Sequence, residues 1–166
     1  MKNLMYRKDF LKKLSIGAGS IFLLPQIVTG QKKIEKGPPV SPEIVKEFVS
    51  KGHSDYDKTK EMLENDPHLL NVFWDWGDGD FESALGGASH VGNKQITLYL
   101  IEKGSMMNIF TAAMLGKIDI VKAILTAFPE QKKALGPHKL NLMHHARKGG
   151  DEALPVLEYF ESLGLK

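Results

Sequence analysis

Apolar residues recur at helical spacing through most of the chain after residue 40. In residues 118–128, IDIVKAILTAF, the apolar side chains fall at i, i+3, i+6 and i+7, which is one face of a helix. These positions are Ile118, Val121, Ile124 and Leu125. Other windows of the chain show similar helical periodicity. The pattern therefore predicts an all-α fold.

Two prolines help to place helix ends. A helix is predicted to begin at Ser41, because serine is a favoured N-cap and Pro42 and Glu43 suit the first turn. Pro155 is expected in the first turn of the last helix, since proline disrupts a helix interior.

Three glycines mark an internal repeat. Gly92, Gly116 and Gly149 each follow small or apolar residues and precede an acid or amide and then an apolar helical pattern. Gly116 and Gly149 are 33 residues apart, whereas Gly92 and Gly116 are only 24 apart, so a hairpin is missing between the first two. Because one helix pair cannot bury its apolar face alone, neighbouring pairs are expected to stack around a shared core.

Residues 92–108, GNKQITLYLIEKGSMMN, resemble the second helix and turn of the ankyrin repeat family. Gly92 matches the family's glycine between the two helices, Gly104 matches the helix cap, and Asn108 matches the turn residue. The resemblance covers about residues 42–166. It implies an ankyrin-type solenoid of about four helix pairs with degenerate or missing hairpins. The implied units span about residues 41–72, 80–108, 109–136 and 137–166.

The first thirty residues have the order of an export signal. Basic residues precede the apolar run LSIGAGSIFLL (residues 14–24), and small residues follow near Gly30. RKDFLKK (residues 7–13) resembles the twin-arginine translocation motif, with Lys8 in place of the second arginine. We expect a signal peptide at 1–30, a linker at 31–40 and the repeat domain at 41–166. The expected location is the bacterial periplasm or another exported site, with a membrane tether as the alternative if the leader is retained.

The charge and the composition of the chain exclude some classes of function. The first thirty residues carry five basic groups and one acidic group, so the rest has 17 basic and 19 acidic groups and a net charge of −2. A domain of that charge offers no general case for nucleic-acid binding. The chain has no cysteine, which excludes disulfides, thiolate metal ligands and a cysteine nucleophile. We expect a monomer.

The stretch GGASHVGNK (residues 86–94) resembles a phosphate-binding loop but fails in detail. Asn93 and Lys94 follow the second glycine, where the motif requires lysine and then serine or threonine. Gly92 is instead predicted to adopt left-handed backbone between two helices. Gly86 and Gly87 are interpreted as letting two helices pack closely. No nucleotide or other cofactor is expected.

The six histidines show no spacing typical of a metal site. Neither His-x-x-x-His nor His-Glu-x-x-His occurs, and His144 and His145 point in different directions if they lie on a helix. His145 is interpreted as a partly buried histidine with its hydrogen bonds satisfied. The sequence therefore predicts no metal ligand among the histidines taken alone.

The segment FWDWGDGDF (residues 73–81) holds both tryptophans, three aspartates and two glycines between the first two units. Ankyrin proteins bind partners through such fingers and the concave face of their first helices. The tryptophans can serve as interface anchors, fold back onto the core of the first unit, or take one role each, and all three interpretations stay open. Candidate partner-binding residues are Trp74, Asp75, Trp76, Asp78, Asp80, His90, Met106, Met107 and Arg147.

The resemblance implies a scaffold that binds another protein without catalysis of its own. No catalytic residue is predicted, because no nucleophile, base and acid converge in the sequence pattern. The alternative is a metal-dependent enzyme or sensor that uses Asp75, Asp78 and Asp80 together with His90. The spacing of these acids is not that of a calcium loop.

Overall fold

The computed structural model describes residues 37–166. The signal peptide predicted for residues 1–30 and residues 31–36 of the predicted linker lie outside the described residues. Pro38–Lys166 form one unit, and its residues are mostly helical, which agrees with the predicted helical class. Within the described range, no helix combines the length and the apolar character needed to cross a membrane.

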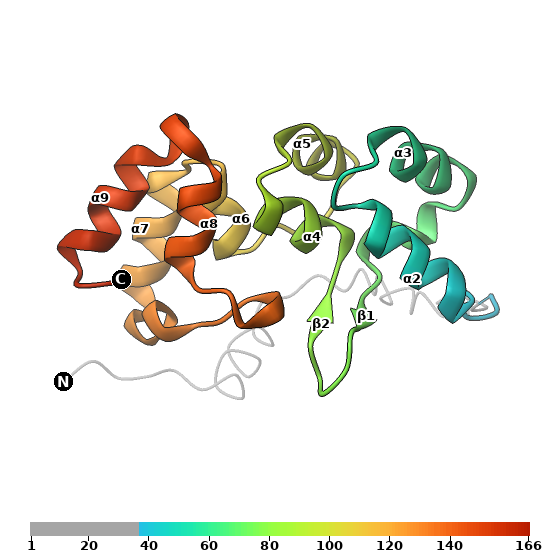
Figure 1. Cartoon of the computed structure of the whole chain (residues 1–166), viewed down its shortest axis with the longest axis horizontal. Helices are drawn as coiled ribbons and strands as arrows, with labels where there is room; N and C mark the ends of the chain where they lie inside the picture. The colour runs from blue at the N-terminus through green and yellow to red at the C-terminus, as the bar shows by residue number, and fades with distance from the viewer. Residues whose placement is uncertain (1–36) are drawn as a thin grey trace, which may run out of the picture. The chain divides into compact units, whose positions relative to one another are not determined.

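The described part of the chain holds eight α-helices in four consecutive pairs (Figure 1). The pairs are α2 (Pro42–Lys51) with α3 (Tyr56–Asn65), α4 (Ala84–Val91) with α5 (Lys94–Glu102), α6 (Ile109–Met114) with α7 (Ile118–Ala127), and α8 (Leu142–Lys148) with α9 (Leu154–Ser162). Four 3-10 helices lie in the connections: η1 (Pro67–Asn71), η2 (Pro129–Lys133), η3 (Pro137–Lys139) and η4 (Gly150–Ala153).

A short hairpin joins the first pair to the second. Its strands β1 (Trp74–Asp75) and β2 (Phe81–Glu82) pair antiparallel, with Trp74 opposite Glu82. The hairpin extends away from the helices (Figure 1). Among the first helices of the pairs, α4 contacts α2, α6 and α8, and α6 also packs against α8. The four pairs are therefore connected mainly through their first helices.

The first helices of the last three pairs begin at side-chain caps. The capping residues Ser83, Asn108 and Asn141 accept hydrogen bonds from the backbone N–H groups three residues later. Such caps each contribute about 1 kcal/mol to stability. The predicted start of the first helix at Ser41 and Pro42 is confirmed, and Pro155 lies in the first turn of α9 as predicted.

One glycine differs from the repeat pattern. The predicted left-handed backbone at Gly92 is confirmed (φ 84°), and Gly116 shares it (φ 66°). Gly149 is instead right-handed (φ −73°), and the left-handed residue of the last pair is Gly150 (φ 62°). Gly149 is required for packing, because a Cβ there would collide with the backbone oxygen of Met114 in α6.

The apolar core has two clusters. The first cluster lies among α2, α3, α4 and α5 and includes Phe48, Leu69, Leu85, Ile96 and Leu100. The second cluster lies among α6, α7, α8 and α9 and includes Val121, Leu142, Met143, Val156 and Phe160. The predicted apolar face of α7 is confirmed, since Val121 and Leu125 are buried and Ile118 and Ile124 pack partly against the cluster.

His145 in α8 is a buried ionisable side chain, with 1% of its surface exposed. Its Nδ1 lies 2.9 Å from the carbonyl oxygen of Asn141 and donates a hydrogen bond to it, since a carbonyl can only accept. Its Nε2 has no partner within the described residues, so the side chain is more buried and less fully satisfied than the sequence suggested. Burial lowers the pKa of His145 to about 4; the Asn141 bond and Glu82 oppose this, while His144 and His90 add to it.

Acidification from about pH 7 to about pH 5.5 is expected to cost about 1 kcal/mol of stability through His145 alone. The unfolded chain binds a proton at this residue near its ordinary pKa, about 6.5. The folded chain binds it only near the lowered pKa of about 4. As the pH falls, the unfolded state therefore gains the proton first.

Urea unfolding of the wild type and of His145→Met at both pH values checks this expectation. Methionine fills a similar volume without titrating, so the wild type should lose about 1 kcal/mol more than the variant. Equal losses in the two proteins would show that His145 does not resist protonation.

Candidate functional site

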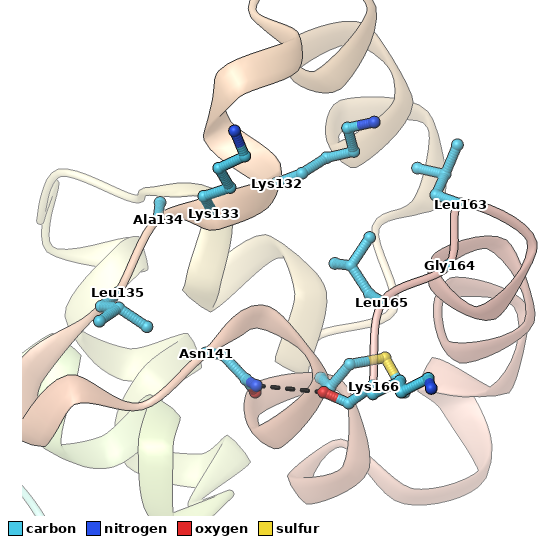
Figure 2. Close-up of a pocket in the computed structure, with 10 residues that line it drawn as sticks. Lys132, Lys133, Ala134, Leu135, Asn141, Leu163, Gly164, Leu165 and Lys166 are labelled. Carbon is cyan, nitrogen blue, oxygen red and sulfur yellow. Dashed lines mark hydrogen bonds between the residues drawn. The ribbon is translucent and has the colours of Figure 1, made fainter.

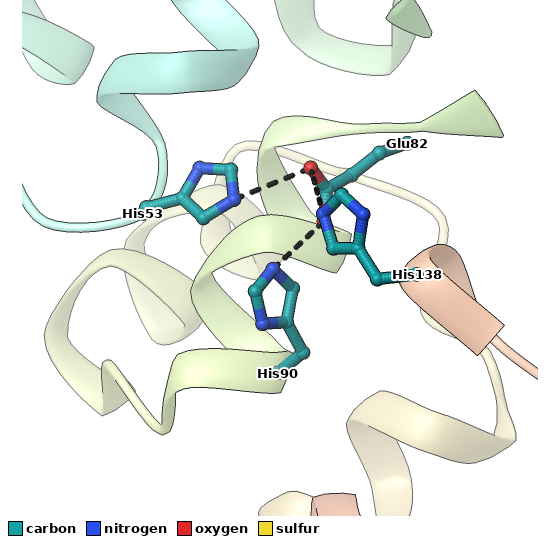
Figure 3. Close-up of side chains that lie close together, drawn as sticks. All are labelled: His53, Glu82, His90 and His138. Carbon is teal, nitrogen blue, oxygen red and sulfur yellow. Dashed lines mark ion pairs between the residues drawn. The ribbon is translucent and has the colours of Figure 1, made fainter. Parts of the chain in front are cut away.

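Four side chains with metal-ligating atoms meet beside the base of the hairpin. His53 follows α2, Glu82 ends β2, His90 lies in α4 and His138 lies in η3. One ligand atom from each residue lies within 4.8 Å of the others (Figure 3). We name these four residues the His–Glu cluster.

The carboxylate of Glu82 is the centre of the His–Glu cluster and is fully buried. Its Oε2 accepts a hydrogen bond of 2.7 Å from the indole Nε1 of Trp76. The same oxygen lies 3.2 Å from Nε2 of His53 and 3.5 Å from Nε2 of His138. The other oxygen, Oε1, lies 3.0 Å from Nε2 of His90. Oε2 therefore faces three ring nitrogens and Oε1 faces one.

The charges in the cluster favour an ionised Glu82. Burial raises the pKa of Glu82, but the contacts with His53 and His90 and the Trp76 hydrogen bond outweigh burial and hold this pKa far below its ordinary value. The contact with Glu82 in turn raises the pKa of His53, although burial opposes the shift. A buried carboxylate that stays anionic attracts positive charge to the site.

The end of α2 orients His53. Its Nδ1 lies 3.0 Å from the carbonyl oxygen of Val49 and 3.1 Å from that of Ser50. These carbonyls belong to the last turn of the helix, where intrahelical donors are missing. The ring packs directly over Gly87 in α4, where a Cβ would lie 2.7 Å from Cε1 of His53. Gly86 and Gly87 were predicted to let two helices pack closely. The group closest to Gly87 is instead the ring of His53, and Gly86 has only ordinary contacts of 3.5 Å.

Asp80 in the hairpin orients His138. Its Oδ1 accepts a hydrogen bond of 2.8 Å from the backbone N–H of His138, and its Oδ2 lies 2.8 Å from the ring Nδ1. His138 has left-handed backbone (φ 57°), which non-glycine residues rarely adopt. The two contacts with Asp80 hold the residue in this conformation and direct its Nε2 towards Glu82.

The tip of the hairpin is a tight turn. Trp76 N–H donates to the carbonyl of Asp80 at 3.0 Å, and Asp80 N–H donates to Gly77 at 3.0 Å. Asp75 accepts a hydrogen bond of 2.9 Å from the backbone of Gly77. Asp78 lies at the exposed tip with left-handed backbone (φ 54°). The acids predicted as one metal set therefore have separate roles in the turn.

The two tryptophans lie in different surroundings. Trp74 is partly buried, with Nζ of Lys46 5.6 Å from the centre of its ring. Trp76 is 37% exposed, and its ring lies edge-on to His53. Neither ring belongs to the apolar cluster of α2 to α5. Trp76 is thus partly exposed to solvent while its N–H donates to the buried carboxylate of Glu82.

The remaining predicted partner-binding residues are dispersed. Met106 and Met107 are exposed in the connection between α5 and α6, and Arg147 is exposed on α8. His90 is instead turned into the His–Glu cluster, with only 12% of its side chain exposed. Of the alternative metal set, His90 alone is a member of the cluster, and Asp80 touches it through His138.

Sequence reasoning missed His53, Glu82 and His138 as one site. The three residues lie on separate segments, so no local spacing links them. The nearest signal in the sequence was Glu82, which directly follows the aromatic and acidic stretch of residues 73–81. That signal does not identify which histidines approach it, because the packing of the helix pairs determines the approach.

A pocket lies away from the cluster, at the C-terminal end (Figure 2). It has a volume of about 430 Å³ and includes Lys132, Lys133, Asn141 and Leu165 in its lining. The side chain of Asn141 donates a hydrogen bond of 3.2 Å to the backbone oxygen of Lys166 there. The titratable side chains among its lining residues are those of Lys132, Lys133 and Lys166.

A smaller groove of about 280 Å³ lies between the hairpin and the segment that precedes α8. Aromatic and aliphatic side chains make up much of its lining, namely Phe73, Phe81, Phe110, Leu135 and Pro137. Asp80, Ser83 and Asn108 also line the groove, so it places a mixed surface of apolar and polar groups next to the hairpin.

Comparison with known proteins yields no match. No protein-family model, no curated protein and no solved structure matches this chain. Function is therefore inferred from the residues and their geometry.

Proposed function

We propose that the protein is an ankyrin-type helical repeat module that is exported from a bacterial cell and binds another protein, with no catalytic step of its own. Four consecutive helix pairs joined through their first helices support the repeat assignment. The recurring caps at Ser83, Asn108 and Asn141 support it as well. The leader pattern of residues 1–30 supports export.

The exposed aromatic side chains of the hairpin are the main support for partner binding. Phe73 is 55% exposed, Phe81 is 59% exposed and Trp76 is 37% exposed. They lie on or beside a turn that backbone hydrogen bonds hold closed. Large aromatic groups on a rigid turn lose little conformational entropy on binding, which is why such groups act as interface anchors.

The adjoining groove and charges suggest the character of the partner. The groove lined by Phe73, Phe81 and Leu135 can receive an apolar side chain. Asp75 and Asp78 are exposed at the tip of the hairpin. A partner that presents an apolar group flanked by basic residues fits this surface, because opposite charges favour encounter and orientation.

The double variant Phe73→Ala/Phe81→Ala is expected to weaken partner capture at least roughly tenfold, since loss of an interface aromatic costs about 1–2 kcal/mol or more. The measurement is capture from an envelope extract of the source bacterium, followed by the affinity of the captured protein. Trp76 is a less suitable position, because its indole N–H is bonded to Glu82.

Phe128→Ala is the matched control. Phe128 is 66% exposed but lies after α7, away from the hairpin in sequence. Its replacement should leave capture unchanged. Equal capture by the hairpin variant and the wild type would rule out the hairpin as the binding surface.

A further inference from the structure

We propose that the His–Glu cluster is a binding site for a divalent transition-metal ion of the class to which Zn²⁺ belongs. The ligands are the Nε2 atoms of His53, His90 and His138 and a carboxylate oxygen of Glu82. The site borders the exposed aromatic surface of the hairpin, because the indole N–H of Trp76 is hydrogen-bonded to Glu82. The proposal rests on the geometry of the cluster and does not depend on the proposed partner-binding function.

The distances between the ligand atoms fit a metal ion. Ligands held about 2.0–2.1 Å from a tetrahedral zinc ion are about 3.3 Å from one another. Nε2 of His53 and of His138 lie 3.2 and 3.5 Å from Oε2 of Glu82, and Nε2 of His90 lies 3.0 Å from Oε1. All four ligand atoms lie within 4.8 Å of each other, so small side-chain adjustments suffice to enclose an ion.

Two buried atoms of the cluster have no hydrogen-bond partner within residues 37–166. Oε1 of Glu82 and Nε2 of His90 lie 3.0 Å apart, but their alignment does not make a hydrogen bond, and both are shielded from solvent. Buried polar atoms without a partner are rare and costly, at about 1–3 kcal/mol each. An ion that accepts a lone pair from each atom satisfies both at once.

The ring nitrogens of two histidines are already prepared for coordination. Nδ1 of His53 faces two backbone carbonyls, and Nδ1 of His138 faces the carboxylate of Asp80. Each of these contacts requires a proton on Nδ1, which leaves Nε2 of the neutral ring with a free lone pair. A carboxylate or carbonyl behind a ligating histidine is the usual outer support of a metal site.

The donor set and its charge select the class of ion. Three imidazole nitrogens favour zinc and neighbouring transition metals, whereas calcium and magnesium prefer oxygen ligands. Glu82 in the site and Asp80 behind His138 supply two negative charges for a divalent ion. Four protein ligands fill a tetrahedral zinc ion, which is typical of a structural site. Such an ion joins the end of α2, the hairpin, α4 and η3.

Calorimetric titration of the full chain, purified without a histidine tag and treated with a chelator, tests the proposal. Zn²⁺ is expected to bind at one ion per chain and to raise the melting temperature. Co²⁺ should bind at the same stoichiometry and give the intense visible absorption of a four-coordinate ion. Ca²⁺ and Mg²⁺ should cause neither effect.

Substitutions at the cluster provide the decisive comparison. His53→Ala and His90→Ala should each abolish the Co²⁺ absorption and the stoichiometric heat. His68→Ala is the control, because His68 has 87% of its side chain exposed and its ring pairs with Asp66, outside the cluster. Asp80→Asn should weaken Zn²⁺ binding by about 10–100-fold, the usual effect of removing an outer support.

Two adjacent glycines form a matched pair. Gly87→Ala should displace the ring of His53 and weaken Zn²⁺ binding at least roughly tenfold, because the new Cβ would lie 2.7 Å from Cε1 of that ring. At Gly86 a new Cβ has ordinary contacts of 3.5 Å, so Gly86→Ala should bind the ion like the wild type. The pair separates an effect on the site from a general effect of alanine in α4.

Two results would overturn the proposal. One is the absence of stoichiometric Zn²⁺ and Co²⁺ binding by the wild type, which would make the cluster a set of ion pairs around Glu82. The other is undiminished binding by His53→Ala, which would place the ion elsewhere. If a buried variant fails to fold, His138→Asn takes its place, since His138 is on the exposed side of the cluster and asparagine tolerates left-handed backbone.

Discussion

Replacing Gly149 with alanine is expected to lower the free energy of unfolding by about 3 kcal/mol, the upper range for forcing extra volume into a packed site. Gly149 is buried at the end of α8, and its Cα faces the backbone oxygen of Met114 in α6. A backbone oxygen cannot rotate away as a side chain can, so the two helices must separate. Urea unfolding of the wild type and the variant measures the change.

Gly150→Ala is the control for the Gly149 prediction. Gly150 has left-handed backbone (φ 62°) but no atom within 4 Å of a new Cβ. Its replacement should cost about 1–2 kcal/mol through the backbone conformation alone. If Gly149→Ala lowers the free energy of unfolding no more than Gly150→Ala does, α6 and α8 do not approach each other as closely as the structure shows.

Glu82→Ala is expected to cost about 3 kcal/mol in the presence of a chelator, the range for removing one member of a buried ion pair. The substitution removes the acceptor of the Trp76 N–H and the partner of the His53 ring. It also leaves a cavity where the fully buried side chain was. Because no metal is present, the loss measures the cluster itself and not the ion.

Two variants calibrate the Glu82 result. Glu82→Gln keeps the shape and an acceptor for Trp76, so it should lose only about half as much. Glu130→Ala removes an acid that is 86% exposed and pairs with Lys133 at the surface. Such pairs contribute little, so its effect should stay within about 0.5 kcal/mol. Similar losses for Glu82→Ala and Glu130→Ala would refute a stabilising role for the buried carboxylate.

Local chemistry made much of the helical structure predictable. The apolar face of α7, the start of the first helix at Pro42 and the place of Pro155 all follow from neighbouring residues in the chain. The left-handed turn at Gly92 was predictable for the same reason. The repeat alignment failed to separate Gly149 from Gly150, because two adjacent glycines give the same local signal.

The aromatic finger was predictable as a feature but not in its contacts. The sequence indicates a turn at Gly77 and Gly79, and these glycines do have positive φ. The hydrogen bond from Trp76 to Glu82 depends on how the two strands pair. The finger's role in partner binding stays a prediction.

The sequence alone determined the helical class, the helix faces and several helix boundaries, because periodicity, caps and prolines act over a few residues. The tertiary structure alone decided that His53, Glu82, His90 and His138 meet in one site. Their encounter depends on the close packing of α4 against α2 and η3, where Gly87 admits the His53 ring and Asp80 orients His138. Contacts between distant segments of this kind leave no periodic or spacing signal in the chain.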